Sequence, residues 1–133
     1  MRLGASIRVL PLLTPLVVLG PLACNRAEAE GPPPSPDAVA GAEAEAVFNQ
    51  RCVACHGTAG KGNGTVASAL GVTPRDYTNR EWQARVSDED LRVVILRGGK
   101  STGKSDYMPP NPDLESKPRV VAALVAKVRG FGK

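Results

Sequence analysis

Apolar residues recur at helical spacing in four parts of the chain, and no part alternates apolar and polar residues as a half-buried strand does. Alanine and glutamate favour the first helix, and acidic residues after a serine mark the start of the third. Glycines end the second and third helices, and a proline begins the fourth. The pattern therefore predicts an all-α fold of about four helices. They run from about Asp37 or Ala38 to Arg51, over residues 66–70, from Ser87 to the glycine pair 98–99, and from Pro118 onward.

The first 23 residues have a different pattern. Arg2 and Arg8 give a positively charged start, and residues 9–22 are almost wholly apolar. This apolar run is too short to span a bilayer as a helix, and three prolines interrupt it. We interpret residues 1–23 as a secretory signal peptide and exclude them from the fold.

Cys24 follows the apolar run directly and resembles the lipidated first residue of a bacterial lipoprotein. We favour lipidation because a lone unpaired cysteine in an exported chain otherwise needs explaining. Acylated Cys24 would anchor the protein to a membrane without a spanning helix. The competing interpretation is cleavage after Ala29, at the end of an A-x-A sequence, which would release a soluble protein. Residues 24–37 are rich in proline and alanine and predict a tether, which leaves 38–133 as the folded domain.

Composition and charge limit the function classes. The 133 residues are enough for one domain with extensions. The formal net charge is +4 at pH 7, and removal of Arg2 and Arg8 leaves about +2. No basic run carries interleaved aromatic residues, so we expect no binding to nucleic acid. Aromatic residues are only 4% of the chain, which is a low content for a small hydrophobic core without disulfides. A buried cofactor would supply the missing apolar mass.

The clearest chemical motif contains the only histidine of the chain, which follows a Cys-x-x-Cys pair in Cys52-Val53-Ala54-Cys55-His56. This motif is typical of covalent haem c attachment, in which both thiols add to the porphyrin vinyl groups and His56 binds the iron. A redox dithiol would need a βαβ context, and a structural zinc site would need four ligands that Cys24, Cys52, Cys55 and His56 are badly spaced to supply. Both alternatives stay open, and we favour one covalent haem c.

Met108 is the candidate for a second iron ligand. The chain has two methionines, and Met1 would leave with the signal peptide. The proline that follows Met108 biases it toward extended backbone and stiffens the loop. A thioether opposite a histidine raises the reduction potential relative to ligation by two histidines. The alternative is that Met108 only packs against the core.

The segment 57–64 is rich in glycine but lacks the phosphate-binding pattern GxxxxGK[ST]. No strand is expected before it, so we reject nucleotide binding. We expect its glycines to let the backbone pass close to a flat cofactor.

From Ala38 to Lys133 the chain resembles a small bacterial class I cytochrome c domain. The resemblance implies a haem-wrapped α-helical fold, haem attachment outside the cytoplasm, electron transfer, and His56 and Met108 as iron ligands. It rests on CVACHG at 52–57, GKGNG at 60–64, PRDYTN at 74–79, WQ and SDEDLRVVILRGG from Trp82, YMPP at 107–110, and a C-terminal helix.

Further residues take roles from this resemblance. Pro74 resembles the family proline whose carbonyl accepts a hydrogen bond from the proximal imidazole, which would orient His56. Tyr77 and Trp82 are possible haem contacts, and Arg75 is a third.

The chain departs from the family pattern where the first and last helices cross. Ala44 stands where the family often has glycine, and Lys127 where it often has an aromatic residue. We expect Phe131 to compensate from further along the last helix.

We expect an electron carrier that is not an enzyme, because two protein ligands leave the iron no position for a small-molecule substrate. Its partners would be redox proteins in the bacterial cell envelope or periplasm, near a membrane to which Cys24 anchors it. Lys61, Lys100 and Lys104 could steer an acidic partner. The alternatives are a haem sensor or ligand-binding protein in which Met108 dissociates, and a haem subunit of a larger oxidoreductase.

Overall fold

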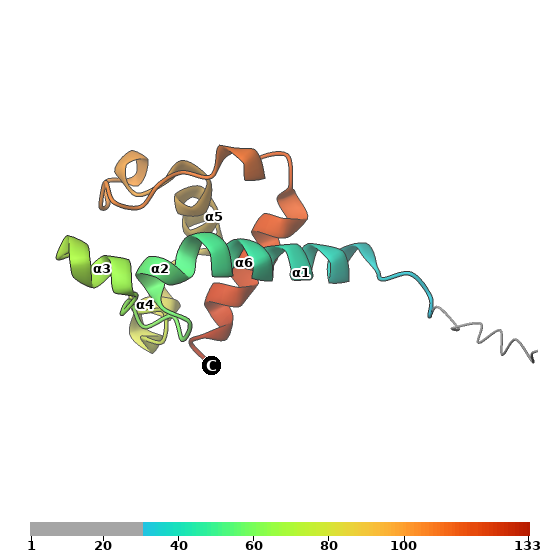
Figure 1. Ribbon diagram of the computed structural model, residues 1–133, viewed down its shortest axis with the longest axis horizontal. Helices are drawn as coiled ribbons and strands as arrows, with labels where there is room; N and C mark the ends of the chain where they lie inside the picture. The colour runs from blue at the N-terminus through green and yellow to red at the C-terminus, as the bar shows by residue number, and fades with distance from the viewer. Residues whose placement is uncertain (1–30) are drawn as a thin grey trace, which may run out of the picture. The chain divides into compact units, whose positions relative to one another are not determined.

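Helices α1 (Pro36–Val47) and α6 (Pro118–Gly130) pack against each other and form the frame of the domain (Figure 1). The computed structural model describes residues 31–133. The predicted signal peptide, the lipidation of Cys24 and the cleavage after Ala29 lie outside the described residues. Within them, every element is helical and no strand occurs, which confirms the predicted all-α fold. None of the described helices is long and apolar enough to cross a membrane.

The sequence predicts that the first helix runs to Arg51, but its α geometry ends at Val47. At Phe48 it passes into a π-helical turn, η1 (Phe48–Cys52), in which the amide of Val53 donates to the carbonyl of Phe48. A short helix, α2 (Val53–His56), then carries the rest of the cysteine motif. The wider turn accommodates an extra residue per turn and changes the register of the side chains that follow. A prediction that extends α1 at 3.6 residues per turn therefore places the cysteine side chains incorrectly relative to α1.

The middle of the chain holds one helix that the sequence pattern does not reveal. Helix α3 (Thr65–Leu70) matches the short turn expected at 66–70. The sequence pattern predicts no helix between residues 71 and 86, but α4 (Arg80–Arg85) lies there. The side chain of Asn79 caps α4 by accepting from the amide of Trp82 at 2.8 Å. With only six residues, α4 is too short for its periodicity to stand out.

Helix α5 (Asp88–Arg97) begins with a capping box, in which the side chains of Ser87 and Asp90 each accept from the other's backbone amide. It ends at the predicted glycine pair. Two short 3₁₀ turns, η2 (Lys100–Thr102) and η3 (Pro112–Leu114), lie in the segment between α5 and α6. They leave the stretch with Met108 without regular structure.

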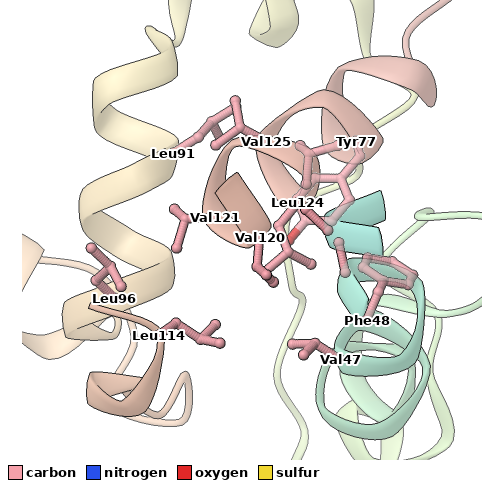
Figure 2. Packing of buried hydrophobic residues seen from close by; sticks show 13 residues of the cluster. Val47, Phe48, Tyr77, Leu91, Leu96, Leu114, Val120, Val121, Leu124 and Val125 are labelled. Carbon is pink, nitrogen blue, oxygen red and sulfur yellow. The ribbon is translucent and has the colours of Figure 1, made fainter. Parts of the chain in front are cut away.

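The core lies where α1, α5 and α6 meet, and Figure 2 shows α6 side chains between those of α5 and those at the end of α1. Ala44 is 2% exposed at the contact with α6, so its methyl fits where the family often has glycine. Lys127 replaces the usual aromatic residue. Its ammonium lies 4.7 Å from the Phe48 ring centroid and 2.7 Å from a Glu45 oxygen. The Phe131 ring is 5.6 Å from that of Phe48, and it supplies the aromatic contact from further along the chain.

Candidate haem site

A cavity of about 550 Å³ lies against the core, between the cysteine motif and the Met108 loop. Cys52, Cys55, His56 and Met108 all line it, although Met108 is more than fifty positions from the motif in the sequence. Most of the remaining wall is apolar, from α5, α6 and the segment 72–77. The volume is in the range of sites for small molecules and cofactors. The fold therefore brings together the four side chains that the sequence singles out.

Cys52 ends the π-helical turn and Cys55 lies on α2, and both are half-buried free thiols. Burial raises the pKa of Cys52 to about 11, since the thiolate is the form that desolvation disfavours. Cys52 is therefore a protonated thiol at neutral pH. Such a group reacts slowly as a redox nucleophile and retains the hydrogen that thioether formation transfers to a vinyl group.

His56 is the only buried charged or polar residue among the described residues, and it is 9% exposed. Burial lowers its pKa, and the backbone of Arg75 opposes this shift only in part, so the imidazole is neutral at pH 7. Its Nε2 lies 3.1 Å from the Tyr77 hydroxyl, and its buried Nδ1 has no hydrogen-bond partner. A neutral imidazole with one unpaired nitrogen is suited to binding a metal.

Pro74 lines the same cavity, but its carbonyl faces Gly62: a Cβ on Gly62, which has φ of +73°, would collide with that oxygen. The hydrogen bond from His56 to Pro74 stays a prediction. A Cβ on Gly64 would likewise collide with the carbonyl of Ala54. These two glycines thus admit neighbouring backbone, whereas the sequence suggested that they make room for a flat cofactor.

Tyr77 and Trp82 both line the cavity, and their contact with haem stays a prediction. The Tyr77 ring stacks on His56, with centroids 4.5 Å apart, and on Trp82 at 5.6 Å. Burial raises the pKa of Tyr77, so the phenol keeps its proton. The Arg75 guanidinium lies 5.7 Å from the Trp82 ring centroid. This aromatic group forms the wall beside the imidazole.

The Met108 loop docks on the glycine pair that ends α5. The amide of Gly99 donates to the carbonyl of Met108 at 2.9 Å. A Cβ on Gly98, which has φ of +75°, would lie 2.7 Å from that carbonyl and 2.8 Å from the nitrogen of Pro110. From the sequence alone, these glycines are predicted only to end the helix. Their second role is to receive the Met108 loop. This role depends on a contact between distant segments, which the periodicity of the sequence does not describe.

Asn111 and Arg51 are two further residues of the site that the sequence pattern does not mark. The Asn111 amide side chain donates to the carbonyl of Ile95 at 2.8 Å, and its backbone amide donates to that of Leu96 at 2.9 Å. Arg51 donates to the side chains of Asn111 and Asp113. These are polar residues in a loop and beside a motif, and nothing in their spacing marks them as partners.

The residues of the cavity fit haem c. The cavity offers two free thiols at the required spacing, a neutral imidazole with a buried unpaired nitrogen, and a thioether. A structural zinc site has no support in residues 31–133, where no group of three or more His, Cys, Asp or Glu side chains could hold a metal ion. No βαβ unit surrounds the thiols in this range, so the redox-dithiol alternative also lacks its context.

Comparison with known proteins agrees with this assignment. Residues 39–126 match the family described as "Cytochrome C oxidase, cbb3-type, subunit III". One solved structure, the KustC0563 c-type cytochrome, is 36% identical in sequence. The match covers 66% of this chain and 95% of that chain, with a TM-score of 0.49. No curated protein matches the chain.

Proposed function

The chain belongs to the class I c-type cytochromes, and we propose that it is a single-haem electron carrier whose iron is held by His56 and Met108. Covalent haem c and electron transfer follow from the family. The two ligands, the partners and the membrane anchor are parts of the proposal. The observation that carries it is the meeting of Cys52, Cys55, His56 and Met108 in one apolar cavity.

Haem c supplies a one-electron Fe(III)/Fe(II) couple when bound. Cys52 and Cys55 would fix the macrocycle through thioethers. His56 would supply a neutral nitrogen ligand, and Met108 a sulfur ligand that raises the potential. The apolar wall would exclude water, so that little reorganisation accompanies the change of charge.

Ligation by both His56 and Met108 would leave the iron no open position, which favours electron transfer over catalysis. A haem sensor would instead need Met108 to dissociate readily. The contacts of Gly99 and Asn111 to the Met108 loop support a closed site, because each ties that loop to the end of α5.

The family match favours a second candidate function. The matching family is named after subunit III of a cbb3-type cytochrome c oxidase, so this chain could be the haem subunit of a larger complex. Purification from native membranes separates the two functions. A stoichiometric catalytic partner supports the subunit, and a monomeric haem protein supports the carrier.

The family implies export. We propose that acylated Cys24 holds the protein at a membrane, with the stretch between Cys24 and the start of α1 at Pro36 as a tether. Lys104 lines the cavity and makes no ion pair among residues 31–133, which supports a role in steering acidic redox partners. Lys61 is also without an ion pair there, whereas Lys100 lies 3.6 Å from Asp106.

A visible spectrum and a redox titration of the haem-loaded protein test the proposal. We expect the long-wavelength absorption of methionine-ligated ferric haem, a single one-electron wave, and slow binding of carbon monoxide to the reduced form. Rapid binding of carbon monoxide, or absence of the methionine absorption, would favour the sensor.

A further inference from the structure

Arg51 joins the segment that carries the cysteine motif to the loop that carries Met108. It immediately precedes Cys52, and its guanidinium reaches residues that are sixty and sixty-two positions later. Its Nη1 lies 3.1 Å from Oδ1 of Asn111 and 2.9 Å from Oδ1 of Asp113, and its Nη2 lies 3.0 Å from Oδ2 of Asp113. One side chain therefore links the two parts of the site.

We call the three hydrogen bonds from Arg51 to Asn111 and Asp113 the clamp, because their chemistry is suited to holding the two segments together. The two parallel bonds to Asp113 use the planar fork of arginine, a geometry that lysine cannot reproduce. The third bond engages Asn111, whose own amide group and backbone are fixed to the end of α5. Arg51 thus holds a loop segment that already has one rigid attachment.

We propose that Arg51 is a positioning residue that keeps the Met108 loop against the cysteine segment and so limits how often Met108 leaves the iron. The inference rests on the proposed function, because it assumes that Met108 is a ligand. Arg51 itself lines the cavity, as do Asn111 and Met108. Loss of the clamp would remove the three side-chain hydrogen bonds that tie the loop to the cysteine segment.

The expected effect is moderate, because the side chains of Arg51 and Asp113 are 41% and 52% exposed. Exposed ion pairs contribute little to stability. The two-bond arginine–carboxylate geometry places this pair at the upper end of the range of such contributions. We therefore expect removal of the clamp to change the methionine dissociation equilibrium about fivefold.

Binding of imidazole to the ferric, haem-loaded full-length protein measures this equilibrium. Imidazole binds the iron only in molecules from which Met108 has dissociated, so its apparent affinity rises in proportion to that fraction. We expect Arg51→Gln to tighten imidazole binding about fivefold. Asn111→Ala should act in the same direction. The double variant should show less than the product of the two effects, because the residues share a contact.

Arg92→Gln is the matched control. Arg92 also makes a two-bond pair with one carboxylate, that of Glu89, at 2.7 and 2.6 Å, and the two side chains are 49% and 64% exposed. That pair lies within α5 and ties no second segment. Arg92→Gln should leave imidazole affinity unchanged. Arg51→Lys keeps the charge without the fork and should resemble Arg51→Gln.

The outcomes separate the two claims. If wild-type ferric protein lacks the methionine absorption, the proposed function fails and this inference fails with it. If the absorption is present but Arg51→Gln binds imidazole as the wild type or Arg92→Gln does, only the clamp is overturned. Wild-type behaviour of Arg51→Lys also overturns it, because charge alone would then account for the effect of Arg51.

Discussion

The Tyr77 hydroxyl lies 3.1 Å from Nε2 of His56, and the two rings stack with an interplanar angle of 14°. Tyr77 in turn stacks with Trp82 and Phe131, and its backbone amide donates to the carbonyl of Gly60 at 2.7 Å. The imidazole is therefore oriented by a side chain that the fold itself fixes. Tyr77 acts as a link between the core and the candidate iron ligand.

Substitutions at the two tyrosines of the chain test this role. Tyr77→Phe keeps the ring and removes the hydroxyl, and we expect a loss of about 1 kcal/mol in the free energy of unfolding. Tyr77→Ala removes a buried ring, and we expect a loss of about 3–5 kcal/mol. Urea unfolding of the haem-loaded protein measures both.

Tyr107 provides the control, because its side chain is 56% exposed. Tyr107→Phe and Tyr107→Ala should each change stability by less than about 0.5 kcal/mol. Equal effects at Tyr77 and Tyr107 would show that the Tyr77 stack contributes nothing special to the fold.

Two glycines with positive φ should respond differently to alanine. At Gly71, with φ of +64°, the space around a Cβ is open, and Gly71→Ala should cost about 1 kcal/mol for the backbone conformation alone. At Gly62 the added Cβ would also strike the backbone carbonyl of Pro74, and the cost should be about 2–3 kcal/mol or more. Thermal unfolding of the two variants measures the difference. A cost at Gly62 no larger than that at Gly71 would contradict the close approach of the two loops.

The elements that the sequence predicts well are those set by local chemistry. The helix start at Ser87 with its acidic first turn, the glycine stop at 98–99 and the proline start at 118 depend only on neighbouring residues, and all three occur in the structure. The cysteine motif and Met108 could be found because their residue types are rare in the chain.

The parts that the sequence does not reveal are those that depend on distant contacts. The π-helical turn at 48–52 changes the hydrogen-bond register without any change in composition. The tie of Arg51 to Asn111 and Asp113 joins polar residues that look like ordinary surface positions. The bond between Tyr77 and His56 likewise arises only when α2 meets the segment 72–77.

The pair of Arg51 and Asp113 should make stability depend on pH at the acid end. The hydrogen bond from Arg51 lowers the pKa of Asp113 below its ordinary 3.8. The stabilisation is therefore complete above pH 3.8 and is lost as the pH falls through the lower, folded-state pKa. We expect Asp113→Asn to be less stable than wild type at pH 7 and equal to it at strongly acid pH. A stability difference that stays constant across this range would contradict the assignment.

The first residue of the mature protein distinguishes lipidation at Cys24 from cleavage after Ala29. We expect the protein from native membranes to have an intact mass that corresponds to acylated Cys24 with one haem. Cys24→Ser should move the protein from the membrane fraction to the soluble fraction. A mass that begins at residue 30 would instead show cleavage after Ala29.

The most direct test of the account is the ferric absorption spectrum of wild type beside Met108→Ala, with Tyr107→Phe as a control in the adjacent position. Ligation by Met108 predicts the long-wavelength methionine absorption in wild type and Tyr107→Phe. It also predicts loss of that absorption in Met108→Ala, together with a lower reduction potential and tighter binding of external ligands. A wild-type spectrum without this absorption, or a Met108→Ala spectrum that retains it, would contradict the assignment of Met108 as the partner of His56.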